Sequence, residues 1–229
     1  MDYVKGDTRA EVLVHGDDGE TEVVPMRVFF RGPSEFSALE EAALDLCRGR
    51  VLDAGAGAGC HTLALQERGF TVCAIDIAPE AVEVMRRRGV EDARCADLFT
   101  FQGAVFETIL LMMNGIGVVG DLVGLDRFLE DVRRLLVPEG QILLDSYDPR
   151  ADDEPRPEAV SAYRSAGERY VGEMRFRLEY RGRRGPPLRW LFLDASLLSE
   201  RAMKAGWSCE LIWREEEGHY LARLSRAAD

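Results

Sequence analysis

The stretch VLDAGAGAG, residues 51–59, decides the fold that the sequence predicts. Its apolar start is typical of a short buried strand, and the glycines Gly55, Gly57 and Gly59 lie just before a helix expected over about 59–68. Glycine lets the main chain turn with positive φ and lets a ligand approach the backbone without a Cβ in the way. A helix N-terminus offers unpaired N–H groups to an acceptor. The stretch therefore predicts a strand, a ligand-binding turn and a helix in succession.

Short apolar strands alternate with helical patterns along the middle of the chain. Strands are expected at 50–54, 71–75, 93–95, 107–113 and 141–145. Because parallel neighbours need a helical crossover, this alternation predicts an α/β fold with a doubly wound, mainly parallel sheet. The stretches WSCELIW and HYLARLS, separated by a short turn, predict a terminal hairpin and an antiparallel C-terminal strand. The sheet is therefore expected to have seven strands.

Local signals place some of the helix ends. Ser37 and Glu40 have the spacing of a capping box at the start of a helix. Apolar residues keep helical spacing from 125 to 136, and Pro138 and Gly140 are expected to break that helix before the fifth strand.

Two segments flank or interrupt the alternating pattern. The length favours one domain over residues 1–229, with 1–33 as an N-terminal extension and 148–193 as an insertion on the substrate side. Within the extension, 10–14 and 21–24 are expected to form a hairpin.

The insertion is expected to contain a second hairpin, between the fifth strand and the last helix. It opens with a polar, proline-containing stretch at 150–168. Apolar and charged residues then alternate over 170–180, residues 181–187 are expected to form the turn, and 188–193 the returning strand. The alternation predicts one side facing the core and one charged, solvated side.

The register of the glycines separates two classes of nucleotide fold. The dinucleotide-binding fingerprint is G-x-G-x-x-G, whereas this turn reads G-x-G-x-G, with Cys60 at the place of the last dinucleotide glycine. The stretch DAGAGAG that begins at Asp53 resembles the first motif of class I S-adenosylmethionine-dependent methyltransferases. The resemblance implies that S-adenosylmethionine is the cofactor and that Asp53, Gly55, Ala56 and Gly57 surround its methionine and ribose parts. Asp53 could instead only cap backbone amides of the turn.

The same resemblance assigns two acidic strand ends. Asp76, at the end of the second predicted strand, matches the acid that grips both ribose hydroxyls, and Ile77 would cover one face of the adenine. A carboxylate can accept two O–H bonds at once. Asp97, at the end of the third predicted strand, matches the acceptor for the adenine amino group, and Leu98 would flank the ring.

Further resemblance follows the fourth and fifth strands. The stretch LLMMNGIG at 110–117 is similar to the family motif that passes the sulfonium, which implies that Met113 and Asn114 contact the cofactor. Asn114 and Tyr147 are expected to contact the substrate, although Asn before Gly is also a common turn pair. Methyltransferases that act on adenine or protein glutamine carry N-P-P-Y here, so N-G-I-G looks more like the small-molecule members.

Composition and net charge limit the possible partners and the cellular compartment. The formal charge of −12 argues against general nucleic-acid binding. The polar first residues lack a secretory signal and no apolar run is long enough for a membrane helix, which favours the cytoplasm. The five scattered cysteines indicate neither disulfides nor a zinc site, and no metal is expected.

The expected activity is transfer of a methyl group from S-adenosylmethionine to an oxygen or nitrogen atom of a small molecule. No catalytic base can be assigned, and the sequence does not indicate an oligomeric state. The glycine turn alone would also suit a non-catalytic module that binds S-adenosylmethionine, or a nicotinamide oxidoreductase. The arginines between 175 and 189 are the one feature that favours an RNA methyltransferase.

Overall fold

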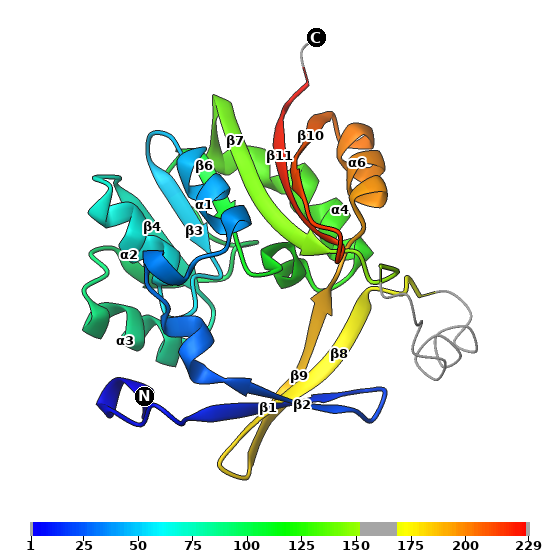
Figure 1. The fold of residues 1–229 in the computed structure, drawn as a ribbon. Coiled ribbons are helices and arrows are strands. Elements are labelled where there is room, and N and C mark those ends of the chain that lie inside the picture. Colours follow the sequence, from blue (N-terminus) through cyan, green and yellow to red (C-terminus); the bar gives the residue numbers. More distant parts are fainter. Residues whose placement is uncertain (1, 152–168, 228–229) are drawn as a thin grey trace.

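A seven-stranded sheet runs through the main body of the protein in the order β10-β11-β7-β6-β3-β4-β5 (Figure 1). The computed structural model describes residues 2–151 and 169–227. The strands of this sheet are β3 (Val51–Ala54), β4 (Val72–Asp76), β5 (Ala93–Cys95), β6 (Phe106–Leu111), β7 (Leu136–Tyr147), β10 (Trp207–Arg214) and β11 (His219–Arg226). Strands β3 to β7 run parallel, and β11 is antiparallel to β7 and β10. The expected mainly parallel sheet with an antiparallel C-terminal strand is confirmed.

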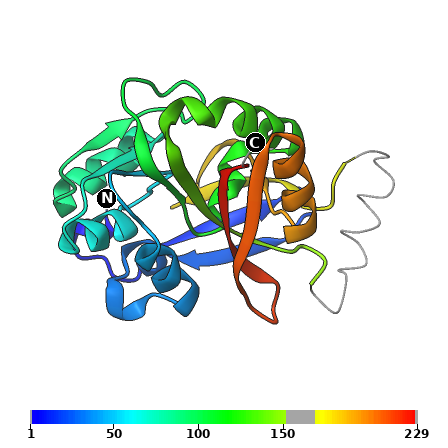
Figure 2. The same cartoon turned by 90° about the horizontal axis from the view of Figure 1, so that it is seen from above.

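Helices cover both faces of this sheet, and Figure 2 shows α1 and α4 on opposite sides of it. The α-helices are α1 (Ala38–Asp45), α2 (Cys60–Glu67), α3 (Pro79–Arg88), α4 (Leu122–Asp131) and α6 (Ala195–Lys204). Short 3₁₀ helices are η1 (Tyr3–Lys5), η2 (Met26–Phe30), η3 (Pro33–Glu35), η4 (Gly115–Val119) and η5 (Val132–Leu135). Successive strand residues serve opposite faces, since Leu52 belongs to the cluster with α4 and α6 while Val51 belongs to the cluster with α1 and α2.

A second, four-stranded antiparallel sheet lies beneath the main one in Figure 1, in the order β2-β1-β8-β9. Its strands are β1 (Glu11–Gly16), β2 (Thr21–Pro25), β8 (Glu173–Tyr180) and β9 (Arg183–Leu191). The expected N-terminal hairpin is present as β1 and β2. Strand β1 also pairs with β8, for example Val14 with Leu178. The N-terminal extension and the insertion therefore build one sheet together, which the sequence did not predict.

Three expected boundaries were wrong. Strand β7 begins at Leu136 and not at 141, because residues 137–140 bulge between the pairs Phe106–Leu136 and Thr108–Gln141. The preceding helix accordingly ends at Asp131 and continues as η5. Strand β6 ends at Leu111, because the backbone turns left-handed two residues later, at Met113 and Asn114.

The turn of the second hairpin is also shorter than expected. Residues 181–187 were expected to form it, but only Arg181 and Gly182 do, with φ of 50° and 74°, and β9 starts at Arg183. Two successive positive φ angles are typical of the tight two-residue turn that matches strand twist. Of the polar stretch expected at 150–168, residues 152–168 lie outside the described part of the chain. Among the described helices, none has the length and apolar character needed to cross a membrane.

Candidate functional site

The glycines of the turn after β3 have different surroundings. A Cβ on Gly59 would lie 2.9 Å from Val90 Cγ2, and one on Gly55 would lie 3.1 Å from Val118 Cγ1, so these two positions need glycine for close packing. Gly57 has φ +56°, and a Cβ there would meet nothing within 4 Å. Its bare backbone borders a large cavity. Gly57 is therefore the place where a ligand can lie against the main chain.

The end of β4 is joined to this turn by the side chain of Asp76. One carboxylate oxygen, Oδ2, accepts the backbone N–H of Gly57 at 2.9 Å, and Oδ1 accepts that of Ala78 at 2.8 Å. Each carboxylate oxygen has two acceptor positions, so each keeps capacity for one further donor, as a pair of hydroxyls would need. Beside it, Ile77 is 71 % exposed, an apolar side chain left uncovered next to the carboxylate.

Other residues expected at the cofactor are turned inward. Asp53 is buried, its Oδ2 accepts the hydroxyl of Thr62 at 2.5 Å, and burial raises its pKa. Ala56 packs on a small apolar cluster that includes Met85. Neither is among the described residues that line the cavity. Through Thr62, Asp53 is tied to the first turn of α2.

At the end of β5, Asp97 and Leu98 form a local turn. The Oδ1 atom of Asp97 accepts the N–H of Phe99 at 2.8 Å. Leu98 packs against the larger apolar core, and its carbonyl accepts from Arg134. Neither is among the described residues that line the cavity.

The backbone after β6 is strained at the cavity wall. Met113 and Asn114 both have positive φ, 65° and 56°, and both line the cavity. An L-residue in the left-handed region costs roughly 1–2 kcal/mol, although Asn tolerates it better than most. Asp145 fixes this turn, since its side chain accepts the N–H groups of Gly115, at 3.0 Å, and Asn114. Burial raises the pKa of Asp145.

The Oδ1 atom of Asn114 is left without a partner. It is buried and accepts no hydrogen bond within the described residues. A buried unpaired acceptor costs about 1–3 kcal/mol, so such an atom is normally satisfied. The unpaired atom therefore adds to the strain of this turn.

The cavity itself has a volume of about 1290 Å³ and lies between the two sheets. One wall is the glycine turn with Met113 and Asn114; the other is the inner face of the four-stranded sheet. That inner face carries Val12, Val14, Val24, Met174, Phe176, Leu178, Leu188 and Trp190. The expectation that the apolar side of β8 packs in the core was therefore wrong: it faces this cavity, and Leu178 is 37 % exposed.

Tyr147, expected at the substrate, lies beside the cavity. Its ring centroid is 4.9 Å from that of His219 and 6.5 Å from that of Phe192. Phe192 lines the cavity, whereas Tyr147 does not among the described residues. On the opposite side of the cavity, the Trp190 indole packs closely on Gly117 of η4. A Cβ on Gly117 would lie 1.9 Å from the indole nitrogen and would clash with it. The small residue in η4 thus makes room for the indole.

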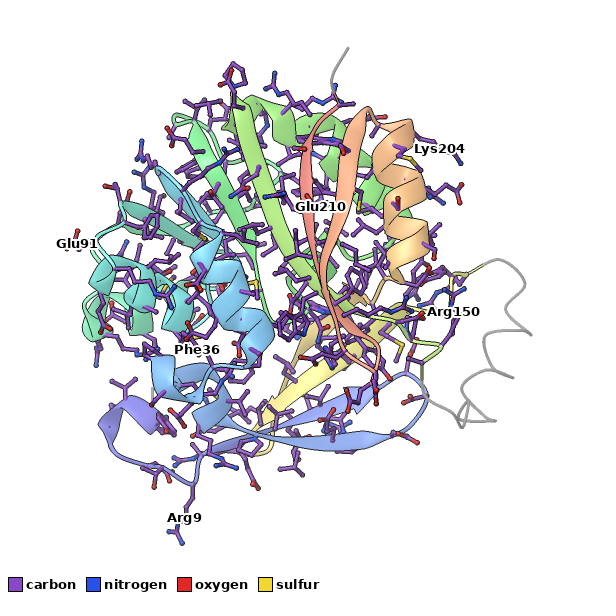
Figure 3. The ribbon with its side chains drawn as sticks, turned by 45° about the horizontal axis from the view of Figure 1, so that its top comes forward. Arg9, Phe36, Glu91, Arg150, Lys204 and Glu210 are labelled. Carbon is purple, nitrogen blue, oxygen red and sulfur yellow. The ribbon has the colours of Figure 1, made fainter. Side chains whose placement is uncertain are left out.

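No sequence pattern indicated the buried charged cluster that lies behind the glycine turn. Arg31 donates two hydrogen bonds to Glu40, at 2.7 and 2.8 Å, and the Nε2 atom of His61 lies 2.8 Å from the same carboxylate. The ring of Phe36, labelled in Figure 3, covers His61 at a centroid distance of 5.1 Å. The capping box of Ser37 and Glu40 is confirmed, but that spacing gave no signal of the second role of Glu40.

The pKa values of two side chains in this cluster are strongly shifted. Burial opposes ionisation of His61, but hydrogen bonds with Cys60 and Glu40 outweigh it and raise its pKa to about 10. Burial likewise opposes ionisation of Glu40, but bonds from His61 and Arg31 lower its pKa to about 2. The cluster ties the segment before α1 to the start of α2 and so supports the glycine turn from behind. The described residues include no group of three or more His, Cys, Asp or Glu side chains suited to a metal ion.

Comparisons with known proteins agree with this geometry. A family model described as a methyltransferase domain matches residues 52–144. A solved SAM-dependent methyltransferase from Bacteroides fragilis, in complex with S-adenosyl-L-homocysteine, has 38 % sequence identity and a TM-score of 0.88, over 99 % of this chain and 92 % of that one. The CcbJ methyltransferase from Streptomyces caelestis shares the fold, with a TM-score of 0.63 at 14 % identity over 85 % of this chain and 94 % of that one.

One curated relative matches over a shorter segment. A ubiquinone biosynthesis O-methyltransferase from Xanthomonas oryzae pv. oryzae is 46 % identical over 52 residues. That segment spans 23 % of this chain and only 22 % of the relative.

Proposed function

Because the chain belongs to the class I S-adenosylmethionine-dependent methyltransferases, we propose that it transfers the methyl group of that cofactor to an oxygen or nitrogen atom of a small molecule. The observation that carries this proposal is the cavity that the bare backbone at Gly57 borders together with Met113 and Asn114. A ligand held at the glycine turn would thereby present its reactive end to the space in front of the four-stranded sheet.

The cofactor site is proposed to divide into residues that touch the ligand and residues that hold the loop. Gly57 and Asp76 would receive the amino-acid and ribose parts, Ile77 would cover the adenine, and Met113 and Asn114 would border the sulfonium. Gly55, Ala56 and Asp53 would act from behind, since they pack inward or bond within the protein. Asp97 and Leu98 would close the adenine end. The fit rests on free acceptor capacity at Asp76 and Asn114.

When bound, S-adenosylmethionine supplies an electrophilic methyl group on a positively charged sulfur. The chain's own residues then have three tasks: to align the incoming atom, to hold both ligands in one water-poor space and to accept hydrogen bonds from the reactants. Asn114 borders the reacting groups, and the apolar face of the four-stranded sheet limits the water around them. Carboxylates also line the cavity, among them Glu22 and Glu80, and the acceptor's proton is proposed to pass through them to solvent.

Salt bridges formed by the arginines on the second hairpin favour small-molecule acceptors over RNA. Arg181 pairs with Asp2 and Asp7, Arg184 with Glu179, and Arg189 with Asp121. These carboxylates neutralise side chains that phosphate groups would otherwise use. Tyr147 remains a predicted substrate residue one layer behind Phe192. The five free cysteines favour a reducing compartment such as the cytoplasm.

The test measures binding and turnover separately. Calorimetry should detect one molecule of S-adenosylhomocysteine per chain and no comparable uptake of a nicotinamide cofactor. Release of S-adenosylhomocysteine should then follow addition of a small acceptor. Binding without turnover across phenols, aliphatic alcohols and amines would favour the non-catalytic module, and salt-dependent RNA binding lost in an Arg183→Ala/Arg184→Ala double variant would favour the RNA enzyme.

A further inference from the structure

The inner face of the four-stranded sheet is an apolar surface that no part of the described chain covers. On β8 the residues alternate, with Phe176 and Leu178 toward the cavity and Arg177 and Glu179 on the other side, so the strand is amphipathic. Leu178 and Leu188 are each 37 % exposed. In a soluble sheet such residues normally pack on a core, and an exposed apolar patch inside a cavity marks a binding surface.

The size of the cavity gives room for a second ligand. Pockets that enclose one drug-sized ligand have volumes of about 300–1,000 Å³. The cavity measures about 1290 Å³, and the glycine turn occupies only one side of it. A cofactor lying against Gly57 therefore leaves the space in front of Phe176, Leu188 and Trp190 for an acceptor.

Aromatic side chains dominate the centre of that space. The rings of Phe176 and Trp190 lie 6.3 Å apart at an interplanar angle of 53°, and Phe192 continues the same wall. Tilted rings at this spacing form faces and edges against which another planar ring packs. The Trp190 indole is held in place by its contact with Gly117, so the wall is built before a ligand arrives.

Polar groups are arranged at the edges of this wall. The exposed charged side chains of the lining are Glu20, Glu22, Glu80, Arg175 and Arg183, and Asp2 and Asp18 line the cavity as well. Asn114 lines it on the cofactor side. An occupant that satisfies both walls has an apolar, planar body and one polar group.

We propose that the acceptor is an aromatic compound that carries a hydroxyl or amino group on its ring, with the ring against the Phe176–Trp190 wall and the O–H or N–H group turned toward Asn114 on the cofactor side. This inference rests on the proposed function. In the transfer, the acceptor oxygen or nitrogen uses a lone pair to form a bond to the methyl carbon. The bond from that carbon to sulfur breaks, its electron pair stays on sulfur, and the acceptor's proton leaves to solvent.

Leu188 and Val23 give a matched test. Leu188 lines the cavity directly opposite Phe176 on the neighbouring strand, while Val23 on β2 is not among the described lining residues and is 50 % exposed. Because a carboxylate is costly next to a bound apolar ring, Leu188→Asp should weaken binding at least roughly tenfold, whereas Val23→Asp should change it less than about twofold. Leu188→Gln provides a second cavity variant if Leu188→Asp does not fold.

The probe is 2-naphthol, titrated by calorimetry into the full chain with and without S-adenosylhomocysteine, with glucosamine as a polar amine for comparison. We expect one 2-naphthol site per chain, weakened by Leu188→Asp and Leu188→Gln but not by Val23→Asp, and no glucosamine binding of similar strength. Equal effects of Val23→Asp and Leu188→Asp, no 2-naphthol site, or tighter binding of glucosamine would overturn the proposal. If the parent protein binds 2-naphthol but not S-adenosylhomocysteine, the proposed function fails while the aromatic site stands.

Discussion

The backbone N–H of Gly57 donates to Oδ2 of Asp76 at 2.9 Å, so the turn after β3 and the end of β4 are held together by one carboxylate. The same group has the free acceptor capacity that ribose hydroxyls require. A side chain that both fixes the loop and receives the ligand should be sensitive to removal.

Replacing Asp76 by Ala should weaken S-adenosylhomocysteine binding roughly 10- to 100-fold, because hydrogen bonds to a charged group contribute about 1.5–3 kcal/mol. Calorimetry on the pure protein measures this directly. The control is Asp131→Ala, at the exposed end of α4. It removes an equal charge from a residue distant from Asp76 in the sequence and should leave the affinity for S-adenosylhomocysteine unchanged. An Asp76→Ala affinity equal to the parent's would count against the cofactor site.

A second prediction compares two glycines with the same backbone requirement. Gly57 and Gly69 have φ of +56° and +85°, and a Cβ on either would meet nothing within 4 Å. Alanine at either position should therefore lower the free energy of unfolding by roughly 1–2 kcal/mol. Only Gly57→Ala should also abolish S-adenosylhomocysteine binding, because only there does the methyl group enter the ligand's space. Equal binding by the two variants would show that the ligand lies elsewhere.

Asn114 should show opposite effects on stability and activity. Asn114→Gly relieves a left-handed backbone and removes a buried unpaired acceptor, so the free energy of unfolding should rise by about 1 kcal/mol. The rate of methyl transfer should fall at least roughly tenfold, because the side chain that borders the reacting groups is lost. Urea unfolding and a product assay measure the two quantities. A variant that is less stable and equally active would contradict the role given to Asn114.

The Arg31–Glu40–His61 cluster predicts a loss of stability in alkali. The pKa of His61 is about 10, above its ordinary value of 6.5, so the folded state holds that proton more tightly than the unfolded state does. The resulting stabilisation is complete below pH 6.5 and disappears as the pH rises through 10. We expect the free energy of unfolding to fall by about 2–4 kcal/mol between pH 7 and pH 10.

Urea titrations across that pH range measure the fall. His61→Gln should abolish most of it, because the titrating group is gone. Ser37→Ala removes the cap of α1 while sparing the ion pairs, and should be less stable than the parent by a constant amount at each pH. The same steep fall in His61→Gln would assign the effect to another group.

Much of the main sheet could be predicted from the sequence because its signals are local. Strand β3, the glycine turn and α2 occupy adjacent residues, and each carries its own pattern of apolar residues and glycines. The capping box at Ser37 is a three-residue spacing, equally legible without a structure. The bulge after Leu136 was missed because Pro138 and Gly140 suit a break in a helix and an irregular strand alike.

The cavity wall could not be predicted in the same way. Alternation on β8 identifies an apolar side, but it does not distinguish a side packed in a core from one that faces an open space. Besides β9, strand β8 pairs with β1, which is distant in the sequence. The contact between His15 and Glu179 joins residues 164 positions apart. The unpaired state of Asn114 is likewise a property of the assembled wall, not of the Asn-Gly pair.

The pairing of β1 with β8 also has a consequence for biosynthesis. The first hairpin leaves the ribosome early, but its neighbouring strand follows 164 residues later, as counted from His15 to Glu179. At about 5–20 residues per second, the hairpin waits roughly 8–30 s with one backbone edge of β1 unpaired. The nascent chain should therefore depend on a holding chaperone during that interval, and slowing its translation should increase aggregation.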